Sequence, residues 1–457
     1  MDEIVCLSPV DGREVARRRL ASPAEIERAL EEARRAQREW AQVPLDARCR
    51  VLGRFVEAME ALNPLIVPEL AWQMGRPVRY SGEFRSLAER VKEMLALVPE
   101  ALGPVGDPEA GRFVTRVPAG LVLVLAPWNY PFLTAANTIV PALLAGNAVL
   151  LKHAAQTPLA GERFAEALAS AGLPEGLFHN LFLSHDDVVR LLASGRIDHA
   201  TFTGSVAGGR AVERAAARRF TTLTLELGGK DAAYVRADAA LDTAVEGLVD
   251  GSFYNSGQSC CGIERIYVEE SVWDPFVDAF VAATELYRLG DPLDPETSLG
   301  PMASPRLAGE VRAQTGEALA AGAEAHVARQ LFPADAPGTA WLMPQVLTGV
   351  DHGMRLMREE TFGPVVGIMK VEGDEEALRL VNDSAYGLTA SIWTQDLDAA
   401  RRLAPRIEAG TVFANRCDYL DPRLAWTGVK DSGRGASLGR YGFDSVTRPR
   451  SFHLRSA

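Results

Sequence analysis

The chain has 457 residues, of which 47% are hydrophobic and 24% charged, a composition typical of globular proteins. Its length suits two or three compact units of roughly 150 residues each. The 48 Lys and Arg residues against 60 Asp and Glu give a net charge of −12, which argues against general nucleic-acid binding because that function needs a cationic surface. An anionic cofactor is not excluded, since backbone amides at a helix N-terminus can hold phosphate.

The sequence predicts a cytoplasmic protein. The first twenty residues are rich in charge and contain no apolar segment of the kind found in secretory signals. The most apolar runs, 120–126 and 139–151, are too short or too interrupted to cross a membrane. Five cysteines in so long a chain do not form a disulfide scaffold, and the adjacent pair Cys260 and Cys261 indicates a reducing compartment.

Helices dominate the first hundred residues. Ser22 and Glu25 have the spacing of a capping box, with Pro23 at the first helical position, so a helix is expected over 23–42. Further helices are expected over 45–62 and 82–98. Glycines and prolines then interrupt the pattern, and a strand pattern at 113–117 indicates an excursion from the first domain.

From residue 121 onward the pattern alternates between strand and helix. The run Leu121–Leu125 is entirely apolar, as expected for a strand buried on both faces. Helices and strands then alternate, which predicts right-handed βαβ units and a parallel sheet; the expected segments are helix 132–145, strand 148–151, helix 158–171, strand 199–203 and a helix ending near 218. A second α/β unit begins after Gly228 and Gly229, and 446–454 is expected to form a strand.

Cys260 follows a polar turn that contains Gly257 and Gln258. A buried, inert thiol is the commoner fate of a single cysteine. A cysteine at such a turn is nevertheless reachable, and a thiolate near a helix N-terminus or a cation is a good nucleophile. Cys261 is expected to point the other way and pack.

Glu226 is an unusual carboxylate, because it stands between Leu225 and Leu227 at the end of an expected strand. It is either a salt-bridged edge residue or a general base whose pKa is raised by partial burial. Gly228 and Gly229 would allow the backbone to turn sharply after it.

Two loops follow strands at the edge where open α/β sheets bind ligands. Asn129 lies in the first loop, where its amide is able to donate to an oxyanion, although by itself it is simply a turn residue. The second loop carries Gly204, Ser205 and Gly209 at a strand–helix junction, where glycines let a diphosphate approach the helix N-terminus. It departs from the G-x-G-x-x-G fingerprint.

Together, and in this order, these motifs resemble the NAD(P)-dependent aldehyde dehydrogenase superfamily from near residue 8 to the tail. Further matching segments are Lys152 with 156–158, 360–364, 386–388 and 430–433. The resemblance implies an α/β fold with a Rossmann-type cofactor domain (1–98 and 120–228), an α/β catalytic domain (229–420) and a small oligomerisation element (99–119 and 421–457). It also implies a homodimer or homotetramer.

The resemblance assigns catalytic roles to three residues. Cys260 would attack the aldehyde to form a thiohemiacetal, and Asn129 with the Cys260 backbone N–H would form the oxyanion hole. After hydride transfer to the nicotinamide, Glu226 would activate the water that hydrolyses the thioester. Two alternatives remain: a coenzyme A-acylating enzyme, whose members typically lack this glutamate, and a non-catalytic member, which would lose one of the three residues.

NADP or NAD is the implied cofactor, and no metal is expected. Lys152 would bind a ribose, Gly204, Ser205 and Gly209 would lie under the diphosphate, Glu360 would hold the nicotinamide ribose and Phe362 would pack beside the nicotinamide. Trp128 and Leu227 complete the expected cofactor-binding residues.

The sequence departs from the family pattern in three places. Ala155 stands where many NAD-preferring members have a glutamate, and His153 lies nearby, so a ribose 2′-phosphate would meet no like charge. The segment 181–185 lacks the usual Pro-Gly. The segments 426–428 and 435–437 replace the usual Pro-Phe-Gly-Gly and Gly-Arg-Glu, so the aldehyde is not defined.

The residues expected to line the substrate pocket are of mixed polarity. They are Phe132, Thr134 and Asn137. No arginine stands out among them as a binding group for a carboxylate.

Overall fold

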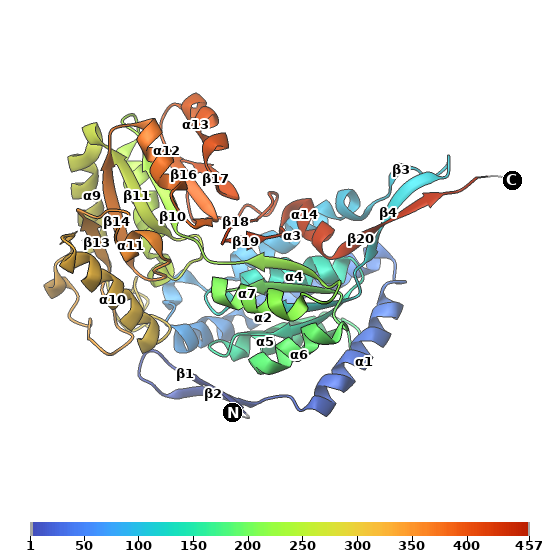
Figure 1. Cartoon of the computed structure of the whole chain (residues 1–457). Coiled ribbons are helices and arrows are strands. Elements are labelled where there is room, and N and C mark those ends of the chain that lie inside the picture. Colours follow the sequence, from blue (N-terminus) through green and yellow to red (C-terminus); the bar gives the residue numbers. More distant parts are fainter. Residues whose placement is uncertain (1–2, 456–457) are drawn as a thin grey trace.

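A parallel sheet with apolar strands needs helices on both faces, and the computed structural model, which describes residues 3–455, shows this arrangement twice (Figure 1). The first sheet has the strand order β19-β9-β8-β5-β6-β7. Its parallel strands are β5 (Leu121–Leu125), β6 (Ala148–Lys152), β7 (Phe178–Asn180), β8 (His199–Thr203) and β9 (Thr222–Glu226). β19 (Gly433–Arg434) adds antiparallel to β9. The expected strands at 121–125, 148–151 and 199–203 are confirmed.

The strand order reverses beside β5, because the chain runs outward through β6 and β7 and returns through β8 and β9. The gap between the carboxyl ends of β5 and β8 is therefore the switch point at which open α/β sheets bind ligands. The loops that hold Asn129 and Gly204 both begin there.

Seven helices accompany this sheet in the described residues. They are α1 (Pro23–Trp40), α2 (Leu45–Met74), α3 (Phe84–Leu102), α4 (Pro131–Leu144), α5 (Pro158–Ser170), α6 (His185–Ser194) and α7 (Val206–Ala216). The capping box at Ser22 and Glu25 is present. The expected end of the second helix at 62 is wrong: α2 continues through Pro64 and Pro68 because its later turns bury apolar side chains in the core, which offsets the local cost of proline.

The second sheet has the order β12-β13-β14-β11-β10-β16-β17. Its strands are β10 (Asp231–Val235), β11 (Ile263–Glu269), β12 (Glu324–Ala325), β13 (Gln345–Thr348), β14 (Val365–Val371), β16 (Thr389–Trp393) and β17 (Thr411–Ala414). The accompanying helices are α8 (Leu241–Phe253), α9 (Trp273–Glu285), α10 (Pro305–Ala320), α11 (Arg355–Arg358), α12 (Asp374–Asn382) and α13 (Leu397–Leu403). A second α/β unit therefore begins directly after Gly228 and Gly229, as expected.

Smaller elements complete the described chain. The hairpin of β1 (Glu3–Leu7) and β2 (Glu14–Arg19) is mostly exposed and had no counterpart among the expected elements. β15 (Tyr386–Gly387) pairs with β18 (Val429–Lys430). The 3-10 turns are η1 (Val78–Tyr80), η2 (Tyr254–Gly257), η3 (Glu270–Val272), η4 (Arg329–Leu331) and η5 (Ala404–Arg406).

A three-stranded arm projects from the body beside α14 (Gly439–Ser445), at the right of Figure 1. It is formed by β3 (Val105–Asp107), β4 (Arg112–Pro118) and β20 (Thr447–His453), with β4 between the other two strands. The expected strands in the excursion and the tail are therefore confirmed. The segment 421–457, expected to belong wholly to the oligomerisation element, is divided: its β20 joins the arm, whereas its β19 belongs to the first sheet.

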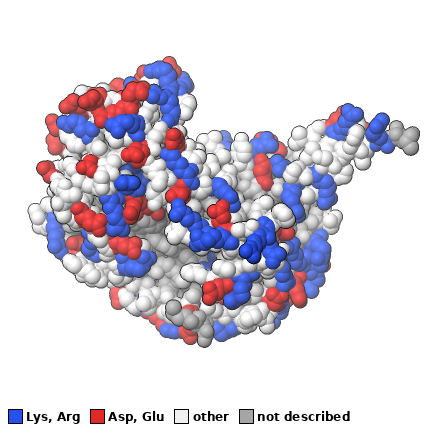
Figure 2. All heavy atoms as spheres, in the orientation of Figure 1, with Lys and Arg blue, Asp and Glu red and all other residues white. Residues whose placement is uncertain are grey.

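Charged side chains of both signs occur over both lobes on the face drawn in Figure 2. Many form surface ion pairs, such as Arg17 with Glu3 and Glu14. Exposed pairs of this kind contribute about 0–1 kcal/mol each, so the fold rests mainly on the apolar cores around the two sheets. Within residues 3–455 no helix has both the length and the apolar character needed to cross a bilayer.

Candidate active site

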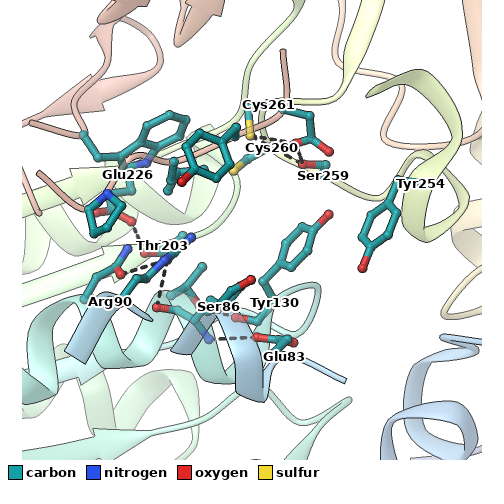
Figure 3. Close-up of a pocket in the computed structure, with 18 of the residues that line it drawn as sticks. Glu83, Ser86, Arg90, Tyr130, Thr203, Glu226, Tyr254, Ser259, Cys260 and Cys261 are labelled. Carbon is teal, nitrogen blue, oxygen red and sulfur yellow. Dashed lines mark hydrogen bonds between the residues drawn. The ribbon is translucent and has the colours of Figure 1, made fainter. Parts of the chain in front are cut away.

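A cavity of about 220 Å³ lies between the two lobes and brings together distant parts of the sequence (Figure 3). Cys260 and Glu226 both line it. Most of its wall comes from the N-terminal half of α3, the first turns of α4 and the loop 418–426, and Thr203, Asp250 and Tyr254 also line it. Two candidate catalytic residues, one at the end of β9 and one in the turn before β11, therefore face one space.

The backbone before Cys260 is held in an unusual conformation. Asn255, Ser256 and Gly257 all have positive φ angles, of 53°, 58° and 69°. A Cβ on Gly257 would lie 2.2 Å from the carbonyl oxygen of Gly363, so only glycine fits there. Such conformations persist only where the surroundings hold them, and they cluster at functional sites. The turn delivers a half-buried Cys260 to the cavity.

Asn129 lies beside this turn rather than on the cavity wall. It is 4% exposed, and its Nδ2 donates to the carbonyl oxygen of Gln258 at 3.2 Å. The buried Arg76 donates to the backbone oxygen of Asn129 and to Oδ1 of Asn255, and it forms an ion pair with Glu83. Arg76 thus ties the Asn129 loop to the cysteine turn, a role that no sequence motif indicated.

Glu226 ends β9 and is buried between two hydroxyl groups. Thr203 Oγ1 donates to its Oε2 at 3.0 Å, and Ser437 Oγ donates to its Oε1. Burial raises the pKa of Glu226, while these hydroxyls and the nearby Arg90 oppose the rise. The interpretation as a salt-bridged edge residue is wrong, because β19 covers β9 and no Lys or Arg nitrogen in residues 3–455 lies within 4.0 Å of this carboxylate.

Cys261 is buried as expected, with 2% of its surface exposed, but it does not point away from Cys260, because both residues line the cavity. Its Sγ donates to Oδ1 of Asp418 at 3.0 Å, and Ser259 Oγ donates to the same oxygen at 2.7 Å. Burial raises the pKa of Asp418 to about 6. Asp418 is a cavity residue that the sequence motifs did not indicate.

The junction between β8 and α7 is a glycine-containing turn at a helix N-terminus, a feature that suits binding of a dinucleotide diphosphate. Ser205 is the N-cap of α7 and accepts from the backbone N–H of Gly208. A Cβ on Gly209 would lie 2.5 Å from Cδ2 of Leu227, so glycine is needed for α7 to pack this closely on the chain after β9. Lys152 is half-buried at the end of β6, on the other side of β5.

Three further candidate cofactor residues gather near the chain that links the two sheets. The rings of Trp128 and Phe362 meet edge to face, with centroids 5.6 Å apart. Glu360 Oε1 accepts from the backbone N–H of Gly229 at 3.1 Å, and a Cβ on Gly228 would lie 2.3 Å from its Oε2. Burial raises the pKa of Glu360 to about 8. The glycine cradle, the helix N-terminus and the paired rings fit an extended dinucleotide.

His153, which lies near Ala155 in the sequence, is buried. Its imidazole is 5% exposed, with Nε2 3.1 Å from the Pro131 carbonyl oxygen and Nδ1 accepting from the Ala154 N–H. Burial lowers the pKa of His153 to about 4. Its ring is therefore neutral and structural, and Lys152 is the cation at this strand end.

Lys230 of the Glu226–Lys230 motif is structural. Its Nζ donates to Glu264 at 2.5 Å and to Thr361 Oγ1 at 2.9 Å. Glu264 in turn accepts from the backbone N–H groups of Thr361 and Phe362. This buried network fixes the loop that presents Phe362, which has a positive φ of 53°.

The cavity contains an arginine that the sequence-based description of the pocket did not include. Arg90 of α3 lines the cavity wall and is 7% exposed. The helical spacing of the sequence places Arg90 on the buried face of α3. It lies three residues after Leu87 and four before Met94, both of which are buried. Charged side chains are rarely buried on the apolar face of an amphipathic helix unless they have a partner, so this position indicates a functional or structural role for Arg90.

Comparisons with known proteins identify the family of this chain. The family model described as "Aldehyde dehydrogenase family" matches residues 1–452. Betaine aldehyde dehydrogenase 2 of Rhizobium meliloti is 34% identical over 98% of this chain and 93% of its own. Succinate-semialdehyde dehydrogenase [NADP(+)] 1 of Mycobacterium tuberculosis is 34% identical over 96% and 97%. The NADP+ complex of succinic semialdehyde dehydrogenase from Streptococcus pyogenes superposes with a TM-score of 0.94 at 28% identity, covering 99% and 100%.

Proposed function

Because this chain belongs to the aldehyde dehydrogenase family, we propose that it oxidises its aldehyde through a covalent Cys260 thioester that Glu226 helps to hydrolyse. The family and its relatives identify the chain as an NAD(P)-dependent aldehyde dehydrogenase. One observation carries the mechanism: Cys260 and Glu226 lie on different elements and line the same cavity. A nucleophile and a carboxylate base facing one space suit covalent catalysis followed by hydrolysis.

The first step is attack of the Cys260 thiolate on the aldehyde carbon. The oxygen of the resulting thiohemiacetal carries negative charge and needs hydrogen-bond donors. The Asn129 amide has two N–H bonds, of which one reaches the Gln258 carbonyl at 3.2 Å. We assign the second, together with the Cys260 backbone N–H, to this oxyanion.

A bound nicotinamide supplies hydride acceptance, which the side chains of a protein do not offer. We propose that Lys152, Gly204, Ser205, Gly209 and Leu227 hold the dinucleotide, because they surround the switch point of the first sheet. Trp128 and Phe362 contact each other, and Glu360 contacts Gly228 and Gly229; we assign these three residues to the nicotinamide end.

Hydrolysis of the thioester then requires a base. The Glu226 carboxylate takes a proton from the attacking water, and its raised pKa makes it a stronger base than an exposed glutamate. An acylating enzyme has no need of such a residue, so the buried Glu226 on the cavity wall favours hydrolysis over transfer to coenzyme A.

The substitution Glu226→Gln tests the proposal. We expect hydride transfer to continue while hydrolysis slows by at least about 10²-fold, because a general base contributes this much. A rapid burst of reduced cofactor would then precede a slow steady phase. Cys260→Ala serves as the control without a burst. If Glu226→Gln lowers the first turnover as much as the steady rate, Glu226 is not the hydrolytic base.

For residues 1–98 and 120–228 we further propose a dinucleotide-binding domain, and for 229–420 a catalytic domain that supplies the cysteine; β20 is the part of the tail that we assign to the oligomerisation element. The arm of β3, β4 and β20 is proposed to join subunits into a homodimer or homotetramer. Its projection from the body and the 65% exposure of Val105 support an interface role. Sedimentation of the purified protein tests this assignment, which a monomer would contradict.

A further inference from the structure

Arg90 is a buried cation with unused hydrogen-bonding capacity. Its Nη1 donates to Oδ1 of Asn137 at 2.9 Å and to the Leu133 carbonyl oxygen at 3.3 Å. Within residues 3–455, Nε and Nη2 make no hydrogen bond, and no carboxylate oxygen lies within 4.0 Å of the guanidinium. A guanidinium has five N–H donors in a planar fork, so most of its donors are unused.

The other deeply buried arginines are satisfied. Arg76 pairs with Glu83 and also donates to Asn255 and Asn129. Arg265 donates from Nε, Nη1 and Nη2 to backbone carbonyls and to the Tyr267 hydroxyl. Burying a charge without a partner is costly, so packing alone does not account for the state of Arg90.

The buried carboxylates around the cavity are bonded elsewhere. Glu83 accepts from Arg76 and from the backbone N–H groups of Phe132 and Leu133. Glu226 and Asp418 each accept from two other side chains. The amide Nδ2 of Asn137, beside Arg90, is also buried and has no partner in the described residues. This part of the wall therefore has donors in excess of acceptors.

Figure 3 shows Arg90 near Glu226 and across the cavity from Cys260. We propose that Arg90 binds the carboxylate of an aldehyde substrate that carries its own carboxylate group, and so selects anionic aldehydes. The inference rests on the function proposed above and specifies its substrate class. The aldehyde carbon would lie at Cys260 while the planar carboxylate pairs with the free edge of the guanidinium, a geometry suited to two parallel hydrogen bonds.

Two alternatives to carboxylate binding by Arg90 predict different preferences among aldehydes. Arg90 opposes the rise in the pKa of Glu226, and if this were its sole role its loss would affect all aldehydes alike. Glu89 and Asp250 also line the cavity, but both are exposed. If they determined specificity, a cationic aldehyde would be preferred.

Three probes of equal chain length separate these cases: 4-oxobutanoate, its neutral methyl ester and the cationic 4-aminobutanal. We expect wild-type kcat/KM to be highest for 4-oxobutanoate. Arg90→Met should lower that value by about 10- to 100-fold, the range for a lost hydrogen bond to a charged group. The ester should change by less than about threefold. Arg90→Lys should recover part of the loss, mainly through KM.

The control is Arg85→Met, which removes an exposed arginine from the same helix and should leave the preference unchanged. Equal losses for all three aldehydes in Arg90→Met, or a wild-type preference for the ester or the amine, would overturn the inference while leaving the proposed function intact. Thermal denaturation of each variant identifies loss of folding, in which case Arg90→Lys decides by its preference between the acid and the ester.

Binding of succinate provides a readout that needs no turnover. Calorimetry should detect succinate binding to Cys260→Ala and not to the double variant with Arg90→Met. Equal binding to both would overturn the inference. If no aldehyde is oxidised with NAD or NADP, the proposed function fails, and the succinate titration still decides whether Arg90 binds carboxylate.

Discussion

Ser437 donates a hydrogen bond to the Oε1 of Glu226, although the two residues are 211 positions apart. The donor comes from the tail, in the segment 435–437 that departs from the family pattern. A hydroxyl that donates to a carboxylate stabilises its charged form. Burial raises the pKa of Glu226, and this hydrogen bond from the tail opposes the rise.

Removing this donor should shift the pH dependence of hydrolysis. Without Ser437 Oγ the pKa of Glu226 rises further. The Glu226 carboxylate therefore becomes protonated, and stops acting as a base, at a higher pH than in the wild type. A hydrogen bond to a charged group contributes about 1.5–3 kcal/mol, and one pKa unit corresponds to about 1.4 kcal/mol. We expect the acidic limb of the steady-state rate in Ser437→Ala to move upward by about one unit.

Ser445→Ala is the matched control, because Ser445 is a nearby serine whose hydroxyl donates to the carbonyl oxygens of Ala436 and Tyr441. Its acidic limb should coincide with that of the wild type. An unchanged limb in Ser437→Ala would show that this hydrogen bond does not control Glu226.

The neighbouring cysteines should respond very differently to substitution. Cys260→Ala should abolish turnover while leaving binding of NAD or NADP nearly intact, because the thiol forms the covalent intermediate. Cys261→Ser should be mild, since a serine hydroxyl is able to keep the bond to Asp418. Steady-state rates and fluorescence titration of the cofactor measure both effects. Substantial turnover in Cys260→Ala would identify Cys261 as the nucleophile.

Asn129→Ala should lower kcat/KM by about 10²- to 10³-fold, the effect of removing one oxyanion donor. The loss should be the same for every aldehyde, because all share the same developing oxyanion. Asn129 also bonds to the Gln258 carbonyl, so thermal denaturation should accompany the kinetics. A loss restricted to one aldehyde would make Asn129 a substrate-contacting residue instead.

Local sequence signals predicted much of the fold and the motifs of the site. The helix that begins after Ser22 and the strand Leu121–Leu125 are determined by residues close together in the sequence, so both were predictable. The continuation of α2 past Pro64 was not, because packing against other helices decides it. Arg90 illustrates the same limit: its position on the buried face was readable, but the lack of a carboxylate partner among residues 3–455 depends on α4 and the cavity.

We expect the choice between NADP and NAD to depend on the neighbourhood of Ala155, which is exposed just after β6. Lys152 is the nearby cation, since His153 is neutral. A 2′-phosphate on the ribose then meets no like charge, and each repulsion avoided at a partly solvated site is worth roughly 1–3 kcal/mol.

We expect wild-type kcat/KM with NADP to be at least as high as with NAD. Ala155→Glu should shift the preference towards NAD by about tenfold or more, equivalent to about 1.4 kcal/mol. Ala155→Gln adds similar bulk without charge and should shift it much less. A strong wild-type preference for NAD that neither substitution alters would show that Ala155 does not select the cofactor.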